Sequence, residues 1–170
     1  MIDATILARA RAWLAPKPPE PIPLVDALAV AAALCRRFEG FFPAPYLCPA
    51  GVATIGFGTT RYRNGHAVTL KDLPISREVA EGLLLHQLQR DYLPEVMRLC
   101  PGITNPLRLA ALIDFTYNLG AGNLRASTLR KRVNAGSWDA VPVELQKWVR
   151  GGGKVLRGLV IRRKAESDLI

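Results

Sequence analysis

The residues with the clearest capacity for chemistry lie between positions 39 and 54 of this 170-residue chain. Glu39 comes at the end of an apolar run and has Phe38, Phe41 and Phe42 as neighbours. Apolar neighbours exclude water from a carboxylate and favour its protonated form, which a general acid requires. A solvated glutamate at a helix end is the alternative, because most such residues have no catalytic role.

The spacing of two further polar side chains favours the catalytic interpretation. Cys48 follows Glu39 by nine positions, and Thr54 follows Cys48 by six and opens the segment 54–58 (TIGFG). This stretch resembles the phage-type lysozymes, the endolysins of tailed bacteriophages. Their motif is a Glu, eight residues, an Asp or Cys, five residues, and a Thr in a T-I-G-x-G segment, which the present chain matches without an insertion.

The resemblance implies a role for each member of the motif. Glu39 would donate a proton to the leaving glycosidic oxygen, and Thr54 would hold the attacking water through its hydroxyl group. Cys48 stands where other members carry a carboxylate, and it would act as a positioned base or as a soft nucleophile. An ordinary thiol has a pKa of about 8.5, so nearby arginines would have to lower the pKa of Cys48 for much thiolate to form at neutral pH.

A second block resembles the C-terminal lobe of the same family. It includes residues 115–120 (FTYNLG), 127–129 (STL), 134–136 (NAG) and 148–166. By resemblance, Tyr117, Asn118, Arg162 and Arg163 bind the glycan substrate. Either Arg162 or Arg163 would reach back to pair with Glu39, which favours the charged carboxylate and opposes the effect of the phenylalanines.

The resemblance implies an α+β fold that is mostly helical and lysozyme-like, with a small β-hairpin lobe and an active-site cleft between two lobes. It covers about residues 24–170, which would form the catalytic domain. Residues 1–23 lie outside it, and their pattern indicates an N-terminal amphipathic helix followed by a Pro-rich linker. A chain of this length suits one compact enzyme.

The activity that the resemblance implies is hydrolysis of the β-1,4 bond between N-acetylmuramic acid and N-acetylglucosamine in bacterial peptidoglycan, which lyses the host cell. Neither a metal nor an organic cofactor is expected. Two alternatives are open at this point. A lytic transglycosylase would cleave the same bond with Glu39 as acid and then base, and a basic, non-catalytic module would only bind the wall or nucleic acid.

The net charge of +9 favours an anionic partner. Peptidoglycan glycan strands suit it, whereas a nucleic-acid partner is not expected because the sequence shows neither an aromatic strand platform nor a reading helix. Asp3 stands where a signal peptide would carry positive charge. We therefore expect synthesis in the bacterial host cytoplasm and release through a membrane-permeabilising, holin-type partner. A monomer would then act on the cell wall from the periplasmic side.

The three cysteines, Cys35, Cys48 and Cys100, lack metal-ligand spacing and form no even-numbered framework, which indicates a reducing compartment. Cys35 lies four residues before Glu39 and so on the same helical face. If the loop that carries Cys48 reaches this face, a Cys35–Cys48 disulfide would lock the enzyme until it is reduced.

The elements that must position these residues follow from apolar periodicity. Residues 24–37 form an apolar run that is shorter than the roughly 20 residues needed to span a bilayer, so they predict a buried helix that carries Glu39. Residues 52–68 alternate small and β-prone residues and predict a hairpin whose tight turn is Asn64-Gly65.

Two further helices are expected. Ser76 is a candidate N-cap for a helix to Tyr92 that joins the lobes, and Pro94 would interrupt the chain after it. The apolar stripe of this helix would be Val79, Leu83, Leu84 and Leu88. Residues 105–117 predict the core helix of the larger lobe, with Leu109, Leu112, Ile113 and Phe115 pointing inward.

Overall fold

The structure is a computed structural model that describes residues 24–170. The amphipathic helix and linker expected over 1–23 lie outside the described residues, and the boundary between 23 and 24 stays a prediction. The helices are α2 (Leu24–Glu39), α3 (Arg77–Gln87), the π-helical segment η1 (Leu88–Tyr92), α4 (Leu93–Leu99), α5 (Pro106–Leu119), α6 (Ala121–Ala126), α7 (Thr128–Asn134), the 3₁₀ turn η2 (Trp138–Ala140), α8 (Val141–Gln146) and α9 (Arg157–Ser167). The strands are β1 (Phe42–Leu47), β2 (Ala53–Gly56), β3 (Arg150–Gly151) and β4 (Lys154–Val155).

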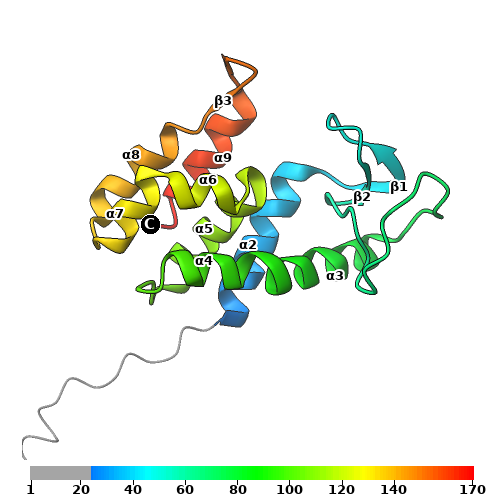
Figure 1. Cartoon of the computed structure of the whole chain (residues 1–170), viewed down its shortest axis with the longest axis horizontal. Helices are drawn as coiled ribbons and strands as arrows, with labels where there is room; N and C mark the ends of the chain where they lie inside the picture. Colours follow the sequence, from blue (N-terminus) through cyan, green and yellow to red (C-terminus); the bar gives the residue numbers. More distant parts are fainter. Residues whose placement is uncertain (1–23) are drawn as a thin grey trace, which may run out of the picture.

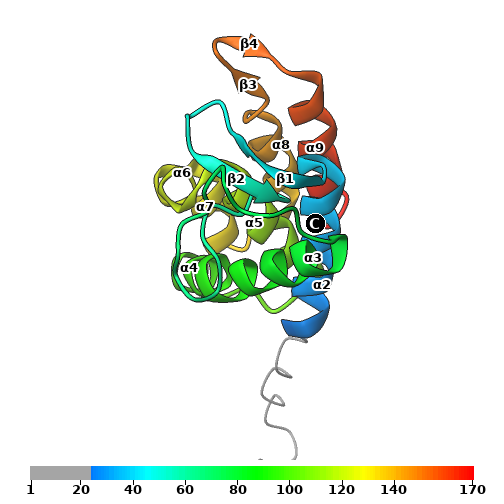
Figure 2. The same cartoon turned by 90° about the vertical axis from the view of Figure 1, so that its right-hand side faces the viewer.

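The elements form a small hairpin lobe and a larger helical lobe. Figure 1 shows β1 and β2 at one side of the molecule and α6–α9 at the other, with α2, α3 and α5 running between them. In the orthogonal view, the short β3–β4 hairpin extends beyond the helices (Figure 2). The predicted α+β architecture, mostly helical with a small hairpin lobe, is confirmed.

Helix α2 buries a face of small residues. Ala27, Ala31 and Cys35 have no exposed surface and recur every four positions, so they lie along one side of the helix. Small side chains allow α2 to pack closely on α5, its principal partner. The buried helix expected over 24–37 is confirmed and continues to Glu39, so the core packing of α2 fixes where this carboxylate emerges.

Helix α5 is the centre of the larger lobe, as predicted. The side chain of Asn105 caps its first turn by accepting hydrogen bonds from the backbone N–H groups of Leu107 and Arg108. The four residues expected to face inward, Leu109, Leu112, Ile113 and Phe115, are all buried.

The hairpin of the small lobe forms earlier in the chain than expected. Strand β2 pairs antiparallel with β1, and the register joins Phe42 to Gly56, Tyr46 to Thr54 and Leu47 to Ala53. The turn of this hairpin is therefore the segment 48–52, which contains Cys48. The tight turn expected at Asn64-Gly65 is present, since the Tyr62 N–H donates to the His66 carbonyl at 2.9 Å and an isolated bridge joins Arg61 to Ala67. The strand pairing differs from the prediction, because β2 pairs with the preceding strand β1 and not with the segment after the turn.

The helix that joins the lobes begins as predicted but runs further. Ser76 caps α3 by accepting a hydrogen bond from the N–H of Val79, whose side chain is exposed rather than part of the buried stripe. Pro94 does not interrupt the chain, because it lies in the first turn of α4, directly after the π-helical segment. A π-turn shifts the local hydrogen bonding, so the missing N–H of proline breaks no helical ladder there.

The two glycines of the TIGFG segment allow close packing of the small lobe. Gly56 has φ +68°, and an added Cβ would lie 2.9 Å from the Cβ of Ala80 in α3. Gly58 has φ +111°, and an added Cβ would lie 2.7 Å from the hydroxyl oxygen of Tyr117 in α5. Both positions combine a left-handed backbone with a neighbour that leaves no room for a side chain.

We expect Gly58→Ala to lower the free energy of unfolding by about 1–3 kcal/mol, because alanine would strain the backbone and clash with Tyr117. The thermal midpoint should fall by roughly 3–10 °C. Gly102→Ala is the matched control, since its added Cβ meets no atom within 4 Å. Equal midpoints for the two variants would contradict this account of the segment.

Candidate active site

Glu39 is the last residue of α2, and it opens into a small pocket. The volume of the pocket is about 240 Å³, and the Glu39 side chain keeps 29% of its surface exposed. The lining comes from the ends of α2 and α5 and from the start of α9: Phe38, Glu39, Asn118, Leu156, Gly158, Leu159 and Arg162. The carboxyl group is therefore reachable by a ligand although the helix that carries it is buried.

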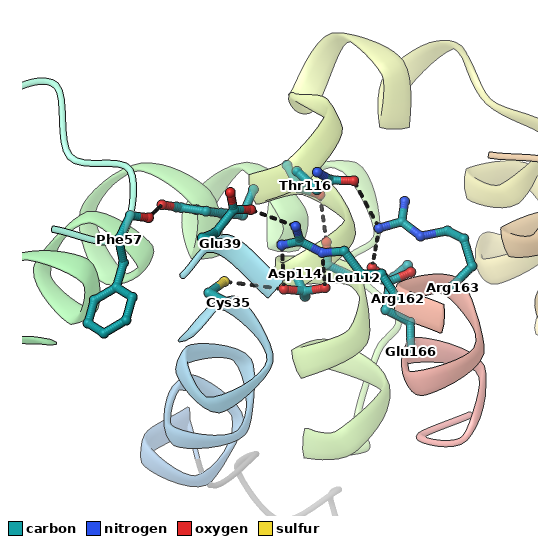
Figure 3. Close-up of polar contacts among 11 residues, drawn as sticks. Cys35, Glu39, Phe57, Leu112, Asp114, Thr116, Arg162, Arg163 and Glu166 are labelled. Carbon is teal, nitrogen blue, oxygen red and sulfur yellow. Dashed lines mark hydrogen bonds and ion pairs between the residues drawn. The ribbon is translucent and has the colours of Figure 1, made fainter. Parts of the chain in front are cut away.

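Of the two candidate arginines, Arg162 forms the ion pair with Glu39. Its Nη1 donates to Glu39 Oε1 at 2.5 Å, while its Nε and Nη2 donate to the two oxygens of Asp114 at 2.9 and 2.8 Å (Figure 3). Burial alone would lower the pKa of Arg162, but the bonds to Asp114 and Glu39 raise it above the usual value. Arg162 is therefore a fixed cation that joins α9 to α2 and α5.

The three phenylalanines do not enclose Glu39 together. Only Phe38 lines the pocket, and its ring lies 5.5 Å from the Arg162 guanidinium. Phe41 packs against Phe57, and Phe42 packs against Tyr46. The local environment of Glu39 is thus set by a buried cation more than by apolar side chains.

Asp114 is the residue at the centre of this cluster that sequence reasoning missed. It has no exposed surface, lies in the buried stretch of α5, and also accepts a hydrogen bond from the Cys35 thiol at 3.2 Å. The available signal was a single carboxylate within the apolar run of a core helix, where a charge needs a partner.

Arg163 points away from Glu39 and into the protein. It has no exposed surface, and its Nη2 donates to Glu166 Oε1 at 2.6 Å and to Asn118 Oδ1 at 3.1 Å. Its guanidinium also lies 5.0 Å from the centroid of the Phe115 ring. The geometry gives Arg163 a structural position, and it offers no support for the expected contact with substrate, whereas Asn118 lines the pocket.

The hairpin brings Cys48 and Thr54 together. The Cys48 backbone N–H donates to the carbonyl of Val52 at 3.0 Å, and the buried Thr54 hydroxyl donates to the same carbonyl at 2.9 Å. Hydrogen bonds from the backbone N–H groups of Val52 and Ala50, and then from Thr54, lower the pKa of the Cys48 thiol. The turn itself stabilises a thiolate, in place of the arginines that the sequence suggested.

Tyr46 lies beside Thr54 in the hairpin, and sequence reasoning did not single it out. Its register partner is Thr54, and alternate residues of an extended chain share a face, so Tyr46, Cys48 and Thr54 lie on one face of the hairpin. Burial, followed by the charges of Cys48 and Glu39, raises the pKa of Tyr46. A raised pKa keeps the Tyr46 hydroxyl protonated, so it can donate a hydrogen bond on this face.

Tyr117 links the two lobes. Its hydroxyl donates to the carbonyl of Phe57 at 2.6 Å, and its ring packs against Tyr92 at a centroid distance of 5.1 Å. Burial raises the pKa of Tyr117, which keeps the hydroxyl protonated as a donor. The expected contact of Tyr117 with substrate remains a prediction.

The comparisons with known proteins agree with this geometry. The family model described as phage lysozyme matches residues 36–166. The chain belongs to the phage lysozyme family. An endolysin of Bacillus phage B103 is 40% identical over 136 residues, which are 80% of this chain and 50% of that protein, so the chain spans about half of this relative. A SAR-endolysin of Bacteriophage PS119 is 31% identical over 134 residues, which are 77% of this chain and 75% of that protein.

A solved structure supports the fold of this phage lysozyme. An endolysin from Escherichia coli O157:H7 phage FAHEc1 matches it with a TM-score of 0.72 at 31% identity, over 82% of this chain and 89% of that one. The lysozyme-like fold is confirmed. Among residues 24–170, no group of three metal-ligating side chains lies together, and no helix combines the length and apolarity that a membrane crossing needs.

The cysteines of this phage lysozyme are free in the structure. Cys35 is buried and bonded to Asp114, and burial raises its pKa well above the ordinary value. Burial also raises the pKa of Cys100 to about 11. The structure therefore does not show the Cys35–Cys48 disulfide that the sequence suggested, because the Cys35 thiol faces Asp114 within the helical core.

We expect iodoacetamide to alkylate one thiol in the folded protein and three in denaturant. Cys48 should react alone, and its rate should rise at a lower pH than that of an ordinary thiol, because the turn lowers its pKa. Thr54→Val removes the one hydroxyl group among the hydrogen-bonding groups that lower the pKa of Cys48, and should move the midpoint of this rate profile to higher pH. Mass spectrometry of the labelled peptides gives the site, and rapid labelling of Cys35 in the folded state would contradict the structure.

Proposed function

We propose that this phage lysozyme is an endolysin that hydrolyses the β-1,4 bond between N-acetylmuramic acid and N-acetylglucosamine in bacterial peptidoglycan. The observation that carries the proposal is the placement of Glu39, which is reachable from a pocket while Arg162 holds one of its oxygens. Membership of a lysozyme family makes glycoside hydrolysis the chemistry that such a carboxyl group serves. The endolysin relatives support peptidoglycan as the substrate.

Glu39 is proposed as the general acid. Cleavage of a glycosidic bond requires a proton on the leaving oxygen, because an alkoxide is a poor leaving group from an oxocarbenium-like centre. In its protonated form, Glu39 donates through the oxygen that Arg162 does not hold. The carboxylate that forms is then stabilised by the adjacent guanidinium.

Cys48 and Thr54 are proposed to act from the opposite face of the sugar ring. A thiolate at Cys48 either removes a proton from the attacking water or attacks the anomeric carbon directly. Thr54 is fixed by its bond to the Val52 carbonyl, so its oxygen can position a water beside Cys48. Tyr46 lies on the same face and completes this side of the site.

Asn118 is the proposed contact to the glycan, since it lines the pocket beside Glu39. Tyr117 is proposed to shape the adjoining surface from its place between the lobes. The enzyme would work as a monomer without metal or organic cofactor. Its net charge of +9 would attract the anionic wall. It would reach the wall from the periplasmic side after synthesis in the host, with release through a holin-type partner.

The test is loss of turbidity of purified peptidoglycan in reducing buffer. We expect Glu39→Gln to lower the rate by about 10²–10⁴-fold, because an amide cannot protonate the leaving oxygen. Cys48→Asp should keep activity and Cys48→Ser should lose it, because only the first supplies an anionic base at neutral pH. Asp139→Asn, a surface variant, is the control.

Product masses complete this test. Hydrolysis adds one water per bond cleaved, whereas a transglycosylase leaves anhydro-muramic ends. Products with anhydro-muramic ends would reject hydrolysis, but Glu39 would remain the proposed acid. Full activity of Glu39→Gln would reject the catalytic assignment and favour a wall-binding module.

A further inference from the structure

Five side chains of chargeable residues, including Glu39, lie close together where α2, α5 and α9 meet. They are Glu39, Asp114, Arg162, Arg163 and Glu166, contributed by α2, α5 and α9 (Figure 3). All except Glu39 are buried. Three carboxyl groups face only two guanidinium groups, so a fully ionised cluster would carry a net charge of −1 with four of its five side chains out of water. Such a charge is strongly unfavourable, and a proton retained by one carboxyl group removes it.

The hydrogen bonds indicate which group retains the proton. Asp114 accepts three hydrogen bonds, from Arg162 Nε, Arg162 Nη2 and the Cys35 thiol, which favours its charged form. Glu39 receives the remaining bond of Arg162 and is open to solvent. Glu166 accepts a hydrogen bond from Arg163 at Oε1 but none at Oε2.

Three buried atoms of the cluster lack a hydrogen-bond partner among the described residues: Glu166 Oε2 and the Nε and Nη1 atoms of Arg163. Of these, Glu166 Oε2 is the one that can gain a partner by taking up a proton. Asp114 raises the pKa of Glu166, by accepting a hydrogen bond from the protonated form and by its negative charge. Two carboxylates cannot bond to each other, but a protonated Oε2 can donate to an oxygen of Asp114. One proton thus satisfies the unpartnered oxygen and balances the charge.

We propose that Asp114 is a positioning residue for Glu39, acting through Arg162, and that Glu166 is kept neutral and donates a hydrogen bond to Asp114. The first part rests on the proposed function, because it assigns Asp114 to the general acid. The second part concerns the folded protein alone. In this arrangement Asp114 fixes two of the guanidinium nitrogens of Arg162, so the third is aimed at Glu39.

The groups around Glu166 act on its protonation in opposite directions. Arg162 and Arg163 face it from its own helix, and Asp114 faces it from α5, while Glu39 and Cys35 of α2 lie on the far side of Arg162 and Asp114. On α8, the buried Glu144 is paired with Lys147. Burial raises the pKa of Glu166, Arg163 lowers it, Asp114 raises it and Arg162 lowers it; burial is the largest of these effects, so the pKa lies well above its ordinary value.

The first experiment compares unfolding of wild type and Glu166→Gln at pH 5 and pH 8. An unfolded glutamate has a pKa of about 4.3, so above that pH the wild type must take up a proton on folding and loses stability as pH rises. The NH₂ group of glutamine can donate the hydrogen bond to Asp114 at every pH. The thermal midpoint of the variant relative to wild type should therefore rise between pH 5 and pH 8, whereas Asp139→Asn should show a constant difference.

The second experiment measures kinetics of Asp114→Asn on a soluble peptidoglycan fragment. Asparagine offers one acceptor to Arg162 and turns an NH₂ group toward it, so kcat should fall about 10–100-fold with little change in KM. Removing an anion next to Arg162 also leaves the cation less compensated. The breakpoint of the pH–rate profile that reports Glu39 should therefore move to lower pH. Asp139→Asn should leave kcat and the profile unchanged.

Each part can be overturned independently. If Glu166→Gln is destabilised equally at both pH values, Glu166 is a charged partner of Arg163 and the neutral form is rejected. If folded Asp114→Asn keeps the wild-type kcat and pH profile, the positioning role is rejected. Activity retained by Glu39→Gln would instead reject the proposed function, and the unfolding experiment would still report on Glu166. The unfolding experiment also stands if Asp114→Asn does not fold.

Discussion

The structure depends on a permanently charged group that has been removed from water. Arg162 is 3% exposed, and a guanidinium cannot escape the cost of burial by losing its proton. It is tolerated because Asp114 takes two of its bonds and Glu39 a third. These partners come from α5 and α2, so the helices must meet where Arg162 lies. The position of Glu39 is thereby fixed by a residue 123 positions later in the chain.

The other half of the candidate site is held by close packing. Gly56 and Gly58 let the backbone of the small lobe approach Ala80 and the Tyr117 hydroxyl, at distances that no side chain would permit. Tyr117 then bonds the carbonyl of Phe57. Glu39 therefore belongs to the ion cluster of the large lobe, whereas Cys48 belongs to a hairpin anchored through glycines.

The features that the sequence predicted correctly are local. The helix that ends at Glu39, the cap at Ser76 and the inward residues of α5 follow from patterns within one or two turns. Strand β1 was missed because Pro43 and Pro45 are unfavourable within strands, and the structure accepts them at an irregular pairing of an edge strand. Asp114 was missed because its meaning depends on Arg162, 48 positions away. No local pattern of the chain contains that pairing.

The charge distribution separates two electrostatic tasks. The whole chain carries +9, which acts over long distances and favours approach to an anionic polymer. The buried cluster has the opposite balance, with three carboxyl groups for two arginines. An excess of carboxyl groups in one place makes their full ionisation harder, so the cluster as a whole tends to retain a proton. A general acid needs such an environment, since a buried arginine alone would favour the charged carboxylate. Asp114 thus offsets the charge of Arg162, and the guanidinium can orient Glu39 with less of the pull toward the charged carboxylate that an unpaired arginine would exert.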